Sequence, residues 1–80
     1  MKLELYKKDS CPFCQRVLRY LANSGRDDII FHDTVNDPGA AEELVAVGGK
    51  LQVPCMLIDG EPMYESMDII KWLHAHPQEA

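Results

Sequence analysis

The chain has 80 residues, a formal net charge of −5 and a hydrophobic fraction of 46%, so residues 1–80 are expected to form one domain with a single small core. The acidic balance speaks against a nucleic-acid partner, which needs a basic surface to neutralise phosphates. No apolar run is long enough to span a membrane and the start lacks a signal peptide, which predicts a cytoplasmic protein without a membrane partner.

The first third of the chain predicts a strand, a helix and a second strand. Leu3 and Leu5 alternate with polar neighbours, as in a short strand. Apolar residues then recur at helical spacing from Cys14 until Gly25 ends the run. They are Val17, Leu18, Leu21 and Ala22. The apolar run at residues 29–31 lacks alternation, so we expect a strand that is buried on both faces and central or parallel in its sheet.

A second helix is predicted after residue 36. Asp37 can cap it, Pro38 suits its first turn, and the pair Gly48-Gly49 ends it. The spacing of its apolar residues predicts one buried face. That face comprises Ala41, Leu44 and Val45.

The last third predicts a hairpin and a third helix. Asp59-Gly60 separates two apolar runs, which is a strong indication of a tight hairpin turn. A helix follows from about Ser66, which is a good N-cap, and His76-Pro77 marks its end. Its apolar face contains Ile69, Ile70 and Leu73.

These elements follow one another in the order β-α-β-α-β-β-α. A helix joins the first two strands, so they are expected to be parallel with a right-handed crossover, whereas the hairpin makes the last two antiparallel. We therefore predict an α/β fold in which three helices flank a four-stranded mixed sheet on both faces.

Two of the three cysteines lie at the start of the first predicted helix. Cys11 precedes Pro12, which suits the first helical position, so its sulfur can receive backbone N–H bonds and the positive end of the helix dipole. Lys8 adds a nearby cation. Such surroundings bring a thiol pKa from about 8.5 to roughly 3.5–7.5. Cys14, one turn later and deeper, has less help from the dipole. We therefore expect Cys11 to attack a disulfide and Cys14 to resolve the intermediate.

Two other interpretations of the cysteine pair are less favoured. Zinc needs four ligands, and the remaining candidates do not form a second closely spaced pair. They are Cys55, His32, His74 and His76. A structural disulfide would close a loop too short to constrain the unfolded chain much. We expect no resident metal, and Cys55 is most simply a small buried core residue.

Three motifs resemble those of glutaredoxins, which have the thioredoxin-like fold. They are KKDSCPFCQRVLRYL, KLQVPCMLIDG and ESMDIIKWL, and the resemblance covers essentially the whole chain in the same order. The sequence C-P-F-C is close to the family's usual C-P-Y-C, with Phe13 in place of tyrosine. A Val-Pro pair before a strand is the second hallmark, and the two together are more specific than either alone.

The resemblance implies a glutathione site. Pro54 would be a cis proline facing the cysteines, and the backbone of Val53 would bind the cysteinyl part of glutathione. Lys8 would lie near the thiolate and the glycyl carboxylate, with Lys50 a weaker candidate for that carboxylate. The complete predicted glutathione site is Lys8, Phe13, Gln52, Val53, Pro54, Glu65 and Ser66.

The chain departs from the glutaredoxin pattern at two points. Gln52 stands where the family usually has threonine. Glu65-Ser66 replaces the usual Gly-Gly and aspartate segment, and instead resembles the Glu/Gln-Ser pair of the N-terminal domain of glutathione S-transferases. Ser66 at a helix start can bind the γ-glutamyl carboxylate and Glu65 the ammonium, although Ser66 as a plain N-cap without a ligand stays an alternative.

The leading prediction is a monomeric, glutathione-dependent thiol–disulfide oxidoreductase of cell redox homeostasis. It would reduce glutathionylated proteins by monothiol chemistry through Cys11 and protein disulfides by a dithiol cycle with Cys14, and glutathione would be the co-substrate. One alternative is a dimer that bridges a [2Fe–2S] cluster through Cys11. Another is a glutathione-binding module of the transferase type, which is less favoured because the sequence stops after the last helix.

Overall fold

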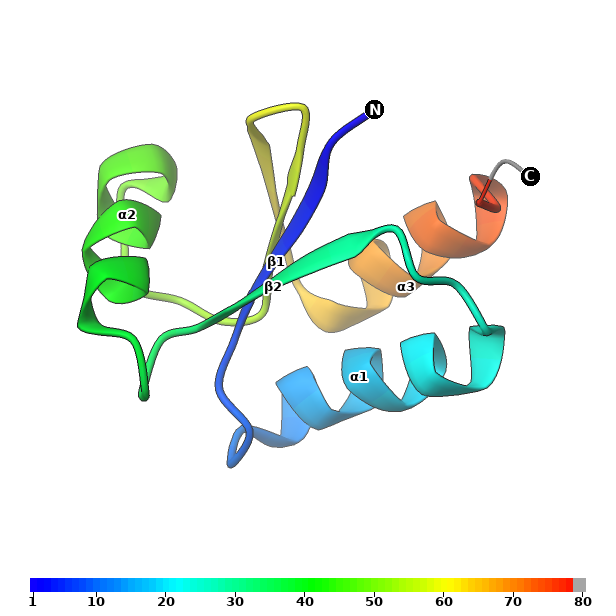
Figure 1. Cartoon of the computed structure of the whole chain (residues 1–80), viewed down its shortest axis with the longest axis horizontal. Coiled ribbons are helices and arrows are strands. Elements are labelled where there is room, and N and C mark those ends of the chain that lie inside the picture. Colours follow the sequence, from blue (N-terminus) through cyan, green and yellow to red (C-terminus); the bar gives the residue numbers. More distant parts are fainter. Residues whose placement is uncertain (79–80) are drawn as a thin grey trace.

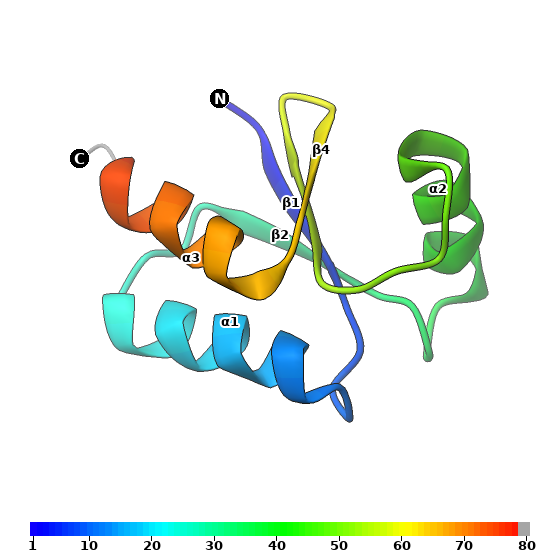
Figure 2. The same ribbon diagram turned by 180° about the vertical axis from the view of Figure 1, so that it is seen from behind.

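The computed structural model describes residues 1–78 and has the predicted order of elements. The strands are β1 (Leu3–Lys7), β2 (Ile29–Asp33), β3 (Cys55–Ile58) and β4 (Glu61–Tyr64), and the helices are α1 (Pro12–Ser24), α2 (Pro38–Gly48) and α3 (Ser66–Ala75). The sheet has the order β2-β1-β3-β4, in which β2 is parallel to β1 and the other neighbours are antiparallel. Helices α1 and α3 lie side by side on one face and α2 lies on the other (Figures 1 and 2), which confirms the predicted α/β arrangement. None of the helices within residues 1–78 is both long and apolar enough to cross a bilayer.

Alternation along the two central strands divides the interior into two clusters. Leu5 and Met56 face α1 and α3, whereas Tyr6, Cys55 and Leu57 face α2, because successive strand side chains point to opposite faces. The first cluster is completed by Val17, Leu21, Ile69 and Leu73, and the second by Ala40 and Leu44. Both helix layers are thereby fixed to the same two strands.

Strand β2 corrects one prediction. It pairs in parallel with β1, as expected, but it forms the edge of the sheet and is not buried on both faces. Ile30 and Phe31 keep 47% and 49% of their surface exposed. The strand residues of the two buried clusters come from β1 and β3, and β2 contributes only the partly buried Ile29.

The turns and helix ends follow from local chemistry. The side chain of Asp37 accepts a hydrogen bond from the N–H of Gly39 at 3.0 Å, and Gly49 ends α2 with a φ of 80°. Asp59 and Gly60 have φ values of 50° and 88°, the two positive angles that a type I′ hairpin turn requires. The predicted capping, stop and hairpin are therefore confirmed.

Two details differ from prediction at the helices. Ser66 is the first residue of α3 and not its N-cap; that position belongs to Glu65, which has a φ of 68° and no side-chain capping bond. On α2, Val45 is 45% exposed while Ala40 is buried. The buried face is shifted toward the start of the helix because Ala40 and Leu44 are the residues that meet Tyr6 and its neighbours.

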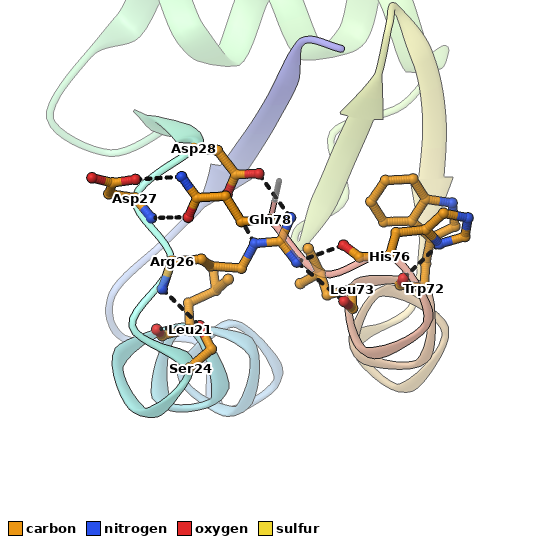
Figure 3. Close-up of polar contacts among 9 residues, drawn as sticks. All are labelled: Leu21, Ser24, Arg26, Asp27, Asp28, Trp72, Leu73, His76 and Gln78. Carbon is orange, nitrogen blue, oxygen red and sulfur yellow. Dashed lines mark hydrogen bonds and ion pairs between the residues drawn. The ribbon is translucent and has the colours of Figure 1, made fainter. Parts of the chain in front are cut away.

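The far end of α3 is tied to the start of β2 by Arg26 (Figure 3). The guanidinium donates two bonds of 2.8 Å to Asp28, and its Nη1 donates to the carbonyls of Leu73 and His76 at 3.1 and 3.0 Å. The Arg26 side chain is only 6% exposed. A cation thus satisfies carbonyl groups at the C-terminal, negative end of α3.

Replacing Arg26 by alanine is expected to lower the free energy of unfolding by about 2 kcal/mol, because it leaves Asp28 and two carbonyls without their donor. Urea denaturation followed by circular dichroism measures the change. The matched control is Arg19→Ala, an exposed arginine of α1, which should shift stability by no more than about 0.5 kcal/mol. Equal effects of both substitutions would contradict a clamping role for Arg26.

Candidate active site

The cysteine pair lies where β1 leads into α1. Cys11 is the N-cap of α1 and Pro12 occupies its first turn. Cys11 is partly exposed while Cys14, one turn later, is fully buried, and both are free thiols. The sulfur of Cys11 lies 3.9 Å from the carbonyl oxygen of Val53. A reachable sulfur and a shielded one are therefore adjacent, beside the segment that precedes β3.

Opposing influences act on the thiol of Cys11. Partial burial raises its pKa, but hydrogen bonds from the backbone N–H and the side chain of Cys14, the N–H of Phe13 and the charge of Lys8 lower the pKa further than burial raises it. The net pKa lies below the usual value. The start of α1 thus favours the thiolate, since its N–H groups have no partner within the helix.

The other two thiols have raised pKa values. Burial raises the pKa of Cys14 to about 11, and the hydrogen bond to Cys11 and the negative charge of the Cys11 sulfur act in the same direction. Burial also raises the pKa of Cys55, which lies in the cluster beneath α2. Of the three thiols, Cys11 therefore loses its proton most readily, whereas Cys14 and Cys55 are held as neutral thiols.

A cavity of about 370 Å³ opens beside Val53. Its lining residues are Phe13, Arg16, Gln52, Val53, Pro54, Glu65, Ser66 and Met67. It thus brings together six of the predicted glutathione-site residues from α1, the α2–β3 loop and the start of α3. The Val53–Pro54 peptide bond is cis, as the resemblance implied. The volume is in the range of small-molecule sites.

Two predicted cations do not line this cavity. Lys8 is exposed, and its positive charge lowers the pKa of Cys11. Lys50 lies with its ammonium 4.6 Å from the centre of the Tyr64 ring. Lys8 is thus better placed to stabilise the thiolate than to contact a ligand deep in the cavity.

Ser66 is the buried polar group of the cavity, at 5% exposure. As the first residue of α3 it carries a backbone N–H without a helical acceptor, next to its hydroxyl. Glu65, immediately before it, is exposed and also lines the cavity. This end of α3 has the donors and the dipole sign that suit a carboxylate, with an acid close by for a cation.

Arg16 and Met67 were not predicted as site residues. Arg16 lies three residues after Phe13, so helical spacing places both on one side of α1, and its guanidinium is 5.8 Å from the Phe13 ring centre. Met67 directly follows Ser66. Spacing alone would have identified Arg16, but Met67 enters the site only because α3 lies against α1.

Residues 1–78 contain no group of three or more potential metal ligands.

Comparisons with known proteins give two related groups. The family model of the glutathione S-transferase N-terminal domain matches residues 10–76. Glutaredoxin 3 of Escherichia coli (strain K12) is 33% identical over 61 residues, which cover 74% of this chain and 70% of that protein. The sequence relationship therefore extends across both cysteines and the cavity.

Solved structures agree on the fold. A thioredoxin-like protein is 25% identical with a TM-score of 0.74, and the match covers 90% of this chain and 99% of that one. Glutathione transferase Omega 3C from Trametes versicolor is 26% identical with a TM-score of 0.78, covering 100% of this chain but 36% of the transferase. The chain thus corresponds to about a third of the transferase.

Alkylation by iodoacetamide at graded pH should separate the three thiols. Of the three, Cys11 is expected to be alkylated at the lowest pH, because its pKa is lowered while those of Cys14 and Cys55 are raised. Cys14, with a pKa of about 11, should react only in strong alkali. Mass spectrometry identifies the modified residue at each pH.

Lys8→Gln is expected to move the pKa of Cys11 upward and slow its alkylation at pH 7, because a favourable charge is lost. Lys2→Gln, at the opposite end of β1, is the control of equal charge change. A Cys11 that titrates at about 8.5 in the unaltered protein, like a free cysteine, would contradict this description of the site.

Proposed function

The chain belongs to the glutaredoxin family of thiol oxidoreductases with the thioredoxin-like fold, and we propose that it is a glutathione-dependent thiol–disulfide oxidoreductase whose nucleophile is Cys11. The observation that carries the proposal is the position of Cys11: a thiol with a lowered pKa lies 3.9 Å from the carbonyl oxygen of Val53, which lines a cavity of about 370 Å³. The proposed partners are glutathione and cytoplasmic proteins that carry glutathionyl groups or disulfides.

In the monothiol reaction, the thiolate of Cys11 attacks the glutathione sulfur of a glutathionylated protein. A Cys11–glutathione disulfide forms, the original S–S bond breaks, and its electron pair leaves on the protein sulfur, which takes up a proton. The thiolate of a second glutathione then attacks the bound glutathione sulfur, giving glutathione disulfide and the Cys11 thiolate. The lowered pKa that favours attack also makes Cys11 a good leaving group.

In the dithiol reaction, Cys11 attacks a protein disulfide and Cys14 completes the cycle. Cys14 loses its proton and attacks the sulfur of Cys11, which forms the Cys11–Cys14 disulfide and releases the reduced protein. Two glutathiones then reduce this disulfide. Burial and the raised pKa of Cys14 support such an order, because Cys14 is protected from attacking substrates directly.

Glutathione would lie extended across the cavity. The backbone of Val53 would pair with its cysteinyl unit, as an added strand does, and Pro54 with Gln52 and Phe13 would form the walls. The hydroxyl and N–H of Ser66 would bind the γ-glutamyl carboxylate, with Glu65 near the ammonium. Lys8 would stabilise the thiolate.

A glutathione-transferase module is the second candidate, favoured by the family model and by Glu65-Ser66 at the start of α3. An assay with glutathione and an electrophilic aromatic substrate separates the two. Turnover of the aromatic substrate without reduction of mixed disulfides would favour the transferase.

Single cysteine replacements test the division of roles. Cys11→Ser should abolish reduction of a glutathionylated peptide, because no other exposed thiolate is available among the described residues. Cys14→Ser should retain much of that activity yet lose reduction of protein disulfides. Cys55→Ala is the control and should retain both reactions. Full deglutathionylation by Cys11→Ser would refute the mechanism.

Ser66→Ala is expected to raise the KM for a glutathionylated peptide about tenfold with kcat little changed, since a hydrogen bond to a charged group is lost. Asp68→Asn, in the same helical turn but outside the cavity lining, is the matched control. Thermal unfolding checks that both variants fold. An unchanged KM in Ser66→Ala would leave Ser66 as a plain helix-start residue.

A further inference from the structure

Positive charge gathers on one helix of an otherwise acidic protein. The net charge is −5, yet α1 contains Arg16 and Arg19 and no acidic residue, whereas α2 contains Glu42 and Glu43 and no basic residue. Helix α1 is also the helix that begins at the reactive cysteine. The basic helix α1 and the acidic helix α2 thus lie on opposite faces of the sheet (Figure 1).

Three cations on α1 or just before it have no acidic partner within the described part of the chain. Lys8, Arg16 and Arg19 form no ion pair with a carboxylate of residues 1–78, whereas Lys2, Lys7 and Arg26 each do. The acid nearest in sequence, Asp9, pairs with Lys7 at 2.6 Å. The charges of the first three are thus available to a partner.

Two exposed apolar side chains line the cavity together with Arg16. Phe13 is 57% exposed and Met67 is 50% exposed, from the adjacent helices α1 and α3 (Figure 2). The guanidinium of Arg16 lies near the Phe13 ring, and a planar guanidinium in this setting suits a carboxylate. Glu65 and Asp68 are exposed acids at the start of α3, so the unpaired cations of this region belong to α1 and to Lys8 just before it.

We propose that this surface, the α1 face formed by Lys8, Phe13, Arg16, Arg19 and Met67, selects substrate proteins whose glutathionylated cysteine is flanked by acidic and apolar residues. The inference rests on the proposed function and names the substrate class of the same site. The glutathionyl group, common to all such substrates, occupies the cavity. The flanking residues of the protein lie over the α1 face, with their carboxylates toward Arg16 and Arg19.

The expected preference is moderate and sensitive to salt. One exposed charge pair changes a rate constant by up to about fivefold. Three cations acting together should therefore make kcat/KM roughly tenfold higher for acidic than for basic substrates. Screening acts over about 8 Å at physiological ionic strength and about 3 Å at 1 M salt. The preference should therefore largely disappear at high salt.

The test measures kcat/KM for three peptides that carry one glutathionylated cysteine with acidic, neutral or basic flanks, and for the mixed disulfide of glutathione with free cysteine. The unaltered protein should prefer the acidic peptide over the basic one by roughly tenfold at low salt. Arg16→Gln and Arg19→Gln should each reduce that preference. Lys2→Gln, with the same charge change at the far end of β1, should leave it intact.

The outcomes separate this inference from the proposed function. Equal kcat/KM for acidic and basic peptides would refute the role of the α1 face in substrate selection, while the oxidoreductase activity stands. An equal loss of preference in Lys2→Gln and Arg19→Gln would refute it as well. If Arg16→Gln slowed all four substrates by the same factor, Arg16 would serve the glutathionyl group and not the protein, which also overturns its role here. Absence of turnover with every substrate would instead refute the proposed function, and the inference with it.

Discussion

The competition between burial and hydrogen bonding at Cys11 is the interaction on which this site depends. A sulfur moved out of water prefers the neutral thiol, and hydrogen-bond donors fixed in place or a nearby positive charge can reverse that preference. Here the donors are the N–H groups of Phe13 and Cys14 at the start of α1. They are available because the first turn of a helix has no internal acceptors for them, so the fold itself supplies donors to the sulfur.

The position of α1 is in turn fixed by packing. Val17 and Leu21 lie in the cluster that Leu5 and Met56 share with α3, so the helix start is held at the end of β1 and next to Val53. Because interiors are tightly packed, a shift of α1 would disturb the whole cluster. The same packing brings the start of α3, with Ser66, to the cavity that Phe13 lines. One hydrophobic cluster thus aligns two helix N-termini on one cavity.

The reactive cysteine pair and the third cysteine lie on opposite faces of the sheet. The face covered by α1 and α3 holds the cysteine pair and the cavity, and Arg26 secures its far end by binding carbonyls at the end of α3. The face beneath α2 buries Cys55 with Tyr6, away from the reactive pair. A third thiol is thereby kept in apolar surroundings, where its raised pKa disfavours the thiolate. The polarity of surface charge follows the same division, because α1 is basic and α2 acidic.

Features that depend on neighbouring residues could be predicted from the sequence: the order of elements, the Asp37 cap, the Asp59-Gly60 turn and the placement of Cys11 before a helix start. These features are set by short-range sterics and hydrogen bonding, which a few consecutive residues encode. The family resemblance also predicted the cis bond before Pro54, and the comparisons with known proteins confirmed the family.

Other features became known only from the packing of the elements: β2 lies at the edge with Phe31 half exposed, and Glu65, not Ser66, occupies the N-cap position of α3. Arg16 and Met67 line the cavity, whereas Lys8 does not. An unbroken apolar run has the same pattern in a buried strand and in a partly covered edge strand, and cavity walls are shared between elements far apart in the chain. Such features depend on contacts between helices and strands that are far apart in the chain, and a short stretch of sequence does not specify these contacts.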